Sequence, residues 1–258
     1  MPYTLSHPAV AVPVSRWLLR MRMLSAVIIG SVVPDFGYLM PVHPPRMETH
    51  SAVALITFCL PMGLLSFWIF QKIIKPAWVS ILSNRVYTRW QAYAAPASLR
   101  DGRQWLLAAC GVLAGAVTHL AWDGFTHEDA RGVRMVPELA DMLEVHGHVV
   151  SGARVLQGVS SLAGLALVIA AIVYALRPGR PVSDGSARVL RSWERRTWAC
   201  VYAVALGCCW AAFMVFDHEH GGYRWLGLSS IAIGLLRALV PTLLGVSLLL
   251  LTYLRIKH

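Results

Sequence analysis

Residues 104–127 read QWLLAACGVLAGAVTHLAWDGFTH, an apolar segment that ends in two histidines and an aspartate. The segment is long enough to cross the roughly 30 Å hydrocarbon core of a membrane as one helix. Positions four apart lie on one helix face, so His119 and Asp123 can present a nitrogen and an oxygen to the same point. Ionisable side chains within a membrane pair with one another, line a wet cavity or hold an ion. The stretch therefore predicts a membrane helix whose end carries a metal site.

The composition of the chain is typical of an integral membrane protein. Of its 258 residues, 57% are hydrophobic and only 14% are charged, whereas soluble domains carry roughly 25% charged residues. We expect an all-α helical bundle of five full spans, preceded by a helical hairpin or re-entrant pair at residues 6–40. The expected spans cover residues 51–74, 104–123, 153–176, 197–216 and 226–254. One domain of residues 1–258 accounts for this pattern, with linkers at residues 76–103 and 178–196.

Basic and acidic residues are sorted between the two ends of these spans. If the helices alternate in direction, 17 of the 23 Lys and Arg residues lie at one end, whereas nine of the ten histidines and ten of the 13 acidic residues lie at the other. The positive-inside rule makes the basic end, both linkers and the C-terminus cytoplasmic. The net charge of +10 then reflects topology and contact with the lipid bilayer, and nucleic-acid binding is not needed to explain it.

Several chain segments can bring polar side chains to the extracytoplasmic end. His7 lies at the start of the first short helix of the expected N-terminal hairpin, and Asp35 lies near the end of the second helix of that hairpin. His50 lies at the start of the first full span. If His7 and Asp35 are the two ends of an antiparallel hairpin, they meet beside His50 and His119. The candidate metal ligands are therefore His7, Asp35, His50, His119, Asp123 and His127.

The position of His127 leaves two alternatives open. An unbroken helix would place His127 roughly 12 Å from His119, which is too far for one ion. Either the helix ends at Gly124 and His127 folds back, or His127 serves a second ion.

Mixed imidazole and carboxylate ligands suit a divalent metal, zinc in the first place, with manganese or iron as alternatives. The five cysteines lie in apolar runs without paired spacing, which argues against a thiolate site. The metal hypothesis assigns His50, His119 and Asp123 as ligands. His7 and Asp35 are then ligands or orienting groups, and His127 is a ligand or an acid/base. Asp35 and His127 are the catalytic candidates.

Four motifs in chain order resemble a known family. They are Thr4-Leu5-Ser6-His7-Pro8, Val33-Pro34-Asp35-Phe36, Thr49-His50-Ser51 and His119-x3-Asp123-x2-Thr126-His127. Together they resemble a bacterial membrane family catalogued as domain of unknown function 4184. They are also similar to inner-membrane proteins described as predicted metal-dependent hydrolases. In those relatives an acidic residue commonly stands two places after the Pro-Asp pair, where this chain has Gly37.

The resemblance implies a multi-pass protein of the bacterial inner (plasma) membrane. It also implies metal-dependent hydrolysis. The chemistry of the ligands makes a phosphoester or amide of a lipid or envelope component the natural substrate, because a zinc ion with an open position provides hydroxide at neutral pH. A second metal ion, if the relatives hold one, would lack a ligand here because of Gly37. A more remote analogy is to the all-helical zinc phospholipase C and nuclease group, in which a His-x3-Asp helix and scattered histidines hold zinc.

Other functions stay open at this point. The same ligands could belong to a metal or small-solute carrier or sensor, and the family could be a non-catalytic membrane scaffold. The helix-end residues could also form a hydrogen-bonded polar stripe that holds no ion.

Arg237, inside the last span, needs a partner. Further histidines at the extracytoplasmic end are His43, His146, His148, His218 and His220, of which the last two form a possible auxiliary cation site or a substrate-facing loop. The oligomeric state does not follow from the sequence.

Overall fold

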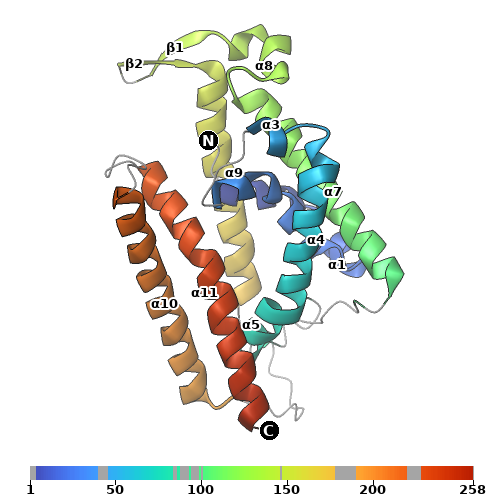
Figure 1. Ribbon diagram of the computed structural model, residues 1–258. Coiled ribbons are helices and arrows are strands. Elements are labelled where there is room, and N and C mark those ends of the chain that lie inside the picture. The colour runs from blue at the N-terminus through green and yellow to red at the C-terminus, as the bar shows by residue number, and fades with distance from the viewer. Residues whose placement is uncertain are drawn as a thin grey trace. The chain divides into compact units, whose positions relative to one another are not determined.

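The computed structural model is almost entirely helical and describes residues 4–39, 46–83, 86–87, 93, 99, 101–145, 147–177, 190–219 and 228–257. The side chains of residues 46–47, 145, 148, 215–219, 228–233 and 236 fall outside this description. Five helical segments are long and apolar enough to span a membrane, which confirms the expected all-α membrane fold (Figure 1). These segments are Leu55–Ile81, Gly102–Thr126, Gly152–Leu176, Ser192–Met214 and Arg237–Lys257.

The chain divides into two compact units, which we describe separately. The first unit comprises Met1–Gly37, Val42–Phe67 and Ser98–Ala175, and the second comprises Tyr38–Pro41, Trp68–Ala97 and Leu176–His258. The expectation of one domain stays a prediction. All six candidate metal ligands belong to the first unit.

The expected N-terminal hairpin consists of four short helical pieces. They are the 3-10 helix η1 (Thr4–Ala11), the α-helices α1 (Ser15–Arg20) and α2 (Leu24–Gly30), and the 3-10 helix η2 (Val33–Leu39). Arg22, with a left-handed φ of 58°, joins α1 to α2. Both α-helices are far shorter than the roughly 20 residues that cross a bilayer. Neither helix is therefore long enough to cross the membrane alone. The 3-10 helix η1 packs against α2 and α7 (Gly102–Thr126).

Two glycines let α2 approach α7 closely. A Cβ atom on Gly115 of α7 would lie 2.6 Å from the backbone nitrogen of Ser31, just after α2, and in contact with the carbonyl oxygen of Val27. A Cβ atom on Gly30 of α2 would meet the backbone of Val112. Any larger residue at either position would push the two helices apart. The close approach fixes the end of α2 beside the face of α7 that carries the candidate ligands.

The first span begins after α3 (Arg46–Thr49) and is longer than expected. It runs through the π-helix η3 (Leu55–Cys59), α4 (Leu60–Ile69), the π-helix η4 (Phe70–Ile74) and α5 (Lys75–Ile81). Pro76 lies in the first turn of α5, where proline loses no helical hydrogen bond. The expected linker at 76–103 therefore begins as helix, and most of its later residues lie outside the described part of the chain. The second expected linker, 178–196, is described only from residue 190 and ends in α10.

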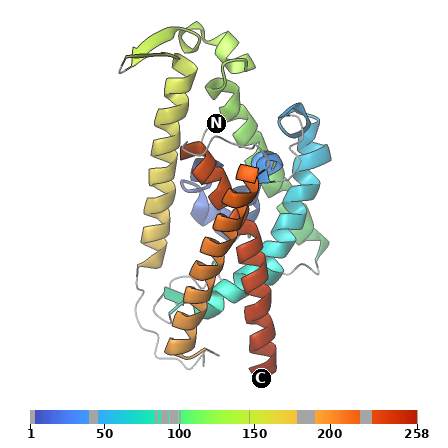
Figure 2. The same ribbon diagram turned by 60° about the vertical axis from the view of Figure 1, so that its left-hand side comes forward.

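A small β-hairpin follows α7, in a region where the sequence pattern predicts only a loop. After α8 (Arg131–Met135) and the 3-10 turn η5 (Pro137–Leu139), strands β1 (Met142–Val145) and β2 (His148–Ser151) pair antiparallel, with Met142 opposite Ser151. Gly147 in the turn has φ +77°, a conformation that glycine adopts without strain. The chain then enters α9 (Gly152–Leu176). Helices α7 and α9 converge at this end of the first unit (Figures 1 and 2).

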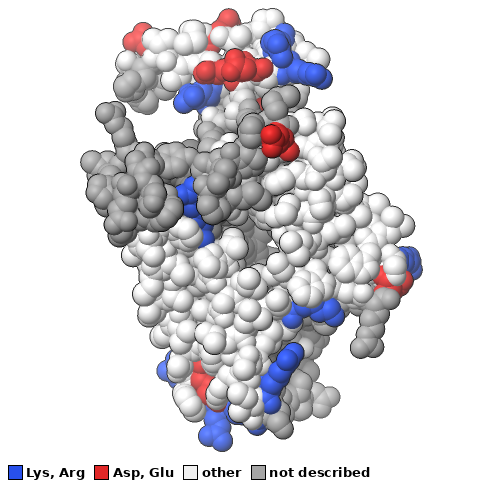
Figure 3. All heavy atoms as spheres, in the orientation of Figure 1, with Lys and Arg blue, Asp and Glu red and all other residues white. Residues whose placement is uncertain are grey.

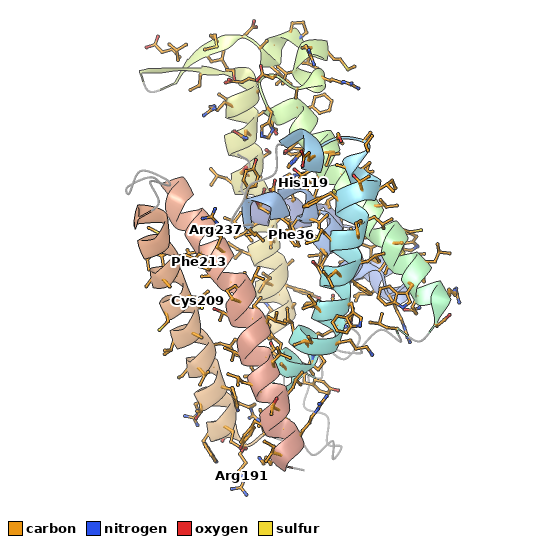
Figure 4. All side chains as sticks on the ribbon, in the orientation of Figure 1. Phe36, His119, Arg191, Cys209, Phe213 and Arg237 are labelled. Atoms are coloured by element: carbon orange, nitrogen blue, oxygen red, sulfur yellow. The ribbon has the colours of Figure 1, made fainter. Side chains whose placement is uncertain are left out.

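The second unit contains a helical pair, α10 (Ser192–Glu219) and α11 (Leu228–Lys257), which lie side by side. Buried Glu194 of α10 accepts hydrogen bonds from Lys257 Nζ at 2.7 and 2.9 Å and from the Tyr253 hydroxyl at 2.6 Å. It also accepts one from the backbone N–H of Arg191. Arg237, labelled on α11 in Figure 4, donates from Nε to the carbonyl oxygen of Tyr38 at 3.1 Å.

Candidate metal centre

His119 and Asp123 lie one turn apart on the buried face of α7. Both side chains are buried, and they continue the line of Gly115 along the helix. The helix does not end at Gly124 but runs unbroken to Thr126. Nε2 of His119 lies 3.6 Å from Oδ2 of Asp123. The four-residue spacing thus brings a nitrogen and a carboxylate oxygen to one point on the helix.

The end of α2 orients the His119 ring. Nδ1 of His119 lies 2.8 Å from the carbonyl oxygen of Ser31, which can only accept a hydrogen bond. Nδ1 therefore carries the proton, and in the neutral ring Nε2 keeps its lone pair. Metal-binding histidines are usually oriented by such a bond from the nitrogen that does not bind the metal. Figure 4 shows His119 on α7 with Phe36, a residue of η2, labelled nearby.

His50 follows α3 directly and is oriented by its neighbour. The hydroxyl Oγ1 of Thr49 lies 2.7 Å from Nδ1 of His50, which leaves Nε2 to face the other candidate ligands. Thr49 is held in turn by Cys59 of η3, whose thiol donates to the Thr49 carbonyl oxygen at 3.6 Å. The start of the first span therefore fixes the direction of this second imidazole.

Asp35 is a buried residue of η2, and its two oxygens have different neighbours. The Thr4 hydroxyl of η1 donates to Oδ2 at 2.6 Å. Oδ1 lies 3.3 Å from Nε2 of His50 and 3.5 Å from Nε2 of His119. Burial raises the pKa of Asp35, but the two imidazoles and the Thr4 hydroxyl favour the carboxylate more strongly, so that the pKa stays below its ordinary range. Asp35 is therefore ionised at neutral pH.

Four donor atoms from three segments of the chain form a ring. Nε2 of His50 lies 3.3 Å from Oδ1 of Asp35 and 3.7 Å from Oδ2 of Asp123. Nε2 of His119 lies 3.5 Å from the first oxygen and 3.6 Å from the second. Ligands at about 2.0–2.1 Å from a tetrahedral zinc ion are about 3.3–3.4 Å apart. The four distances are thus close to the edges of a zinc coordination tetrahedron.

His7 adds a third imidazole beside the ring. Its ring stacks on that of His119, with centroids 3.8 Å apart and an angle of 25° between the planes, and its Nε2 lies 3.8 Å from Oδ1 of Asp123. Burial and the nearby His119 lower the pKa of His7 from 6.5 to about 4, so the ring is neutral at pH 7. Among the described residues, the buried Nε2 atoms of His7 and His119 have no hydrogen-bond partner. Buried polar atoms without a partner are rare in folded proteins, and a bound cation would satisfy both nitrogens.

The ligand atoms make two groups of three that could hold a metal ion, and His119 belongs to both. One group is His7, His119 and Asp123, and the other is Asp35, His50 and His119; within each group the atoms lie within 4.8 Å of one another. Because one imidazole nitrogen binds one ion, the shared His119 favours a single metal position. The donors are nitrogens and carboxylate oxygens, which suit zinc and also manganese or iron.

His127 lies at the edge of this cluster and belongs to neither group. It is the residue that ends α7, with an extended backbone, so its ring folds back along the helix. Nδ1 of His127 lies 3.2 Å from the carbonyl oxygen of Asp123 and 3.7 Å from its Oδ2. Nδ1 therefore donates a hydrogen bond to this carbonyl oxygen and does not offer a lone pair. The side chain is 21% exposed, compared with 6% for Asp123.

The remaining histidines at this end are not placed. His43, His146 and His220 lie outside the described residues, and the side chains of His148 and His218 are not described. Three groups that orient the ligands were not assigned from the sequence. Thr4, three residues before His7, and Thr49, next to His50, stand inside the quoted motifs and were an available signal. The Ser31 carbonyl is a main-chain group and left no signal in the sequence.

The chain matches a family model over nearly its whole length. The family model described as Domain of unknown function (DUF4184) matches residues 1–249. No curated protein and no solved structure matches the chain.

Proposed function

The chain belongs to the DUF4184 family, and from the convergence of its imidazole and carboxylate groups we propose that it is a membrane-embedded, metal-dependent hydrolase. The observation that carries the proposal is the ring of His50, His119, Asp35 and Asp123, with donor atoms 3.3–3.7 Å apart. Among the described residues, the buried Nε2 of His119 has no hydrogen-bond partner. A divalent cation, zinc in the first place, would do so.

His50, His119 and Asp123 would hold the ion. His7, whose ring stacks on that of His119, would be a further ligand or would orient His119. When bound, a zinc ion with an open coordination position polarises water or a substrate oxygen and so allows hydrolysis near neutral pH. Asp35 lies against both imidazoles and is held at Oδ2 by the Thr4 hydroxyl, and it would be the group that accepts the proton of the attacking water. His127, more exposed and bound to the Asp123 backbone, can protonate the leaving group.

The substrate would be a phosphoester, ester or amide of a lipid or envelope component, because the ligands belong to a membrane-spanning helix. By the positive-inside rule the site faces the extracytoplasmic side of a bacterial inner membrane. A carrier or sensor would use the same ligands without hydrolysis. The resemblance to predicted metal-dependent hydrolases supports the enzyme.

Metal analysis of the purified full-length protein tests the proposal. After zinc loading and removal of free metal, we expect about one ion per chain, as a single three- or four-ligand site requires. The double variant His119→Ala, Asp123→Ala should retain none. Leu106→Ala, at an exposed position near the other end of α7, is the matched control and should keep the ion. Equal metal in all three proteins would overturn the proposal, as would tight binding without hydrolysis of any phosphoester, ester or amide lipid.

A further inference from the structure

The depth of the ligands along α7 can be read from the side chains that α7 exposes. Trp122 and Phe125 are exposed apolar residues, whereas Glu128 and Asp129 are exposed charged residues just beyond the helix end. Trp122 donates from Nε1 to Ser160 of α9 at 3.2 Å, and tryptophan is typical of membrane interfaces. Figure 3 shows charged side chains gathered over the α8 and hairpin end. The hydrocarbon boundary therefore lies close to Thr126.

The metal ligands lie slightly on the hydrocarbon side of that boundary. At a rise of 1.5 Å per residue, Asp123 is about 4.5 Å and His119 about 10.5 Å below the end of α7. Residues 104–122 contain no Lys, Arg, Asp or Glu, so α7 offers no other charged level within the membrane. In a glycerolipid, the ester carbonyls lie where the acyl chains begin, and the phosphate lies further towards water. The ligands are therefore closer to the level of the esters than to that of the phosphates.

The surface next to the ligands is apolar. Leu5, two residues before His7, is 49% exposed, and Val53, three residues after His50, is 69% exposed. Such side chains make favourable contacts with acyl chains. A water-soluble substrate would gain no such contacts from them. The apolar surface therefore favours a substrate that already lies in the membrane.

We propose that the substrate is a glycerolipid and that the bond cleaved is the carboxylic ester that joins an acyl chain to glycerol. The inference rests on the proposed hydrolase function. Water adds its oxygen to the ester carbonyl carbon, and the bond between that carbon and the glycerol oxygen breaks. The glycerol oxygen takes up a proton, and the products are a lysolipid and a fatty acid, which releases its proton to water.

Two matched lipids test the inference with the zinc-loaded full-length protein in vesicles. One probe is diacyl phosphatidylethanolamine, and the other is its dialkyl ether analogue, which has the same phosphoester but no acyl ester. We expect lysolipid and fatty acid from the first lipid and no product from the second, as measured by mass spectrometry. Diacylglycerol or its ether counterpart, formed by cleavage of the phosphoester, would overturn the inference and leave the hydrolase proposal standing.

Variants distinguish a wrong substrate assignment from a metal site that does not form. Val53→Ser should raise the KM for vesicle lipid several-fold and leave kcat nearly unchanged, whereas Leu106→Ser, also exposed and apolar, should change neither. His119→Ala should abolish product formation. A protein that holds zinc but hydrolyses neither lipid contradicts the ester assignment, and a protein that holds no zinc contradicts the proposed function as well.

Discussion

Replacing Gly115 with alanine would test whether the close approach of α2 to α7 sets up the centre. The new Cβ would lie 2.6 Å from the Ser31 nitrogen and would also contact the Val27 carbonyl. Overpacking typically costs about 1–3 kcal/mol, and because backbone atoms cannot rotate away, we expect the upper end of this range. Removing a glycine from the helix interior returns up to about 1 kcal/mol. The expected net loss of unfolding free energy is therefore about 2 kcal/mol.

Gly124→Ala is the matched control on the same helix. No atom lies within 4 Å of a Cβ at Gly124, so this variant should be as stable as the unmodified protein or more stable by up to about 1 kcal/mol. Unfolding in mixed detergent micelles, followed by circular dichroism, measures both variants. Equal stabilities for the two variants would refute the packing argument.

The same pair of variants also reports on the metal centre. Pushing α2 away moves the Ser31 carbonyl from Nδ1 of His119, and loss of such an orienting bond typically weakens metal binding by about 10–100-fold. Competition with a zinc chelator measures the affinity. Gly115→Ala should lose affinity in this range and Gly124→Ala should not. Unchanged affinity in a destabilised Gly115→Ala protein would show that Ser31 does not orient the ligand.

Three further predictions concern other contacts. Thr49→Val removes the hydroxyl 2.7 Å from Nδ1 of His50 and should weaken zinc binding by about 10–100-fold without loss of helicity; unchanged chelator competition would contradict this. The pKa of His7 is lowered in the fold from 6.5 to about 4, so the folded protein favours the neutral ring. The contribution of His7 to the stability of the metal-free protein is therefore fully present above pH 6.5 and is lost as the pH falls to about 4. The variant His7→Gln should show a smaller loss across that interval, and parallel curves would be inconsistent with the lowered pKa. Glu194→Gln weakens the hydrogen bonds from Lys257 and should lower the stability of the second unit while zinc content stays unchanged. A loss of zinc in this variant would contradict the assignment of the site to the first unit alone.

The sequence was informative where the structure is local and periodic. Runs of apolar residues predicted the five spans, and the four-residue spacing of His119 and Asp123 predicted their common face. The interpretation of residues 6–40 as a hairpin also predicted that His7 and Asp35 would meet near His50 and His119, and the structure brings these four residues together.

Other features depend on packing or on main-chain groups and could not be predicted in the same way. The first linker was expected to begin at Pro76, but Pro76 occupies the first turn of α5, where proline is tolerated. The hairpin at 142–151 has short strands and a glycine turn, which make a weak signal. The Ser31 carbonyl that orients His119 depends on the distance between α2 and α7. That distance is set by glycines whose role is visible only in three dimensions.

X-ray absorption at the zinc edge tests the central claim most directly, because it reports the atoms around the ion. The zinc-loaded protein should show nitrogen and oxygen ligands at about 2.0–2.1 Å, with outer scattering from imidazole rings that decreases in His50→Ala and again when His119→Ala is added. A protein that retains no zinc, or a zinc spectrum that neither substitution alters, would contradict the claim that these residues form a metal centre.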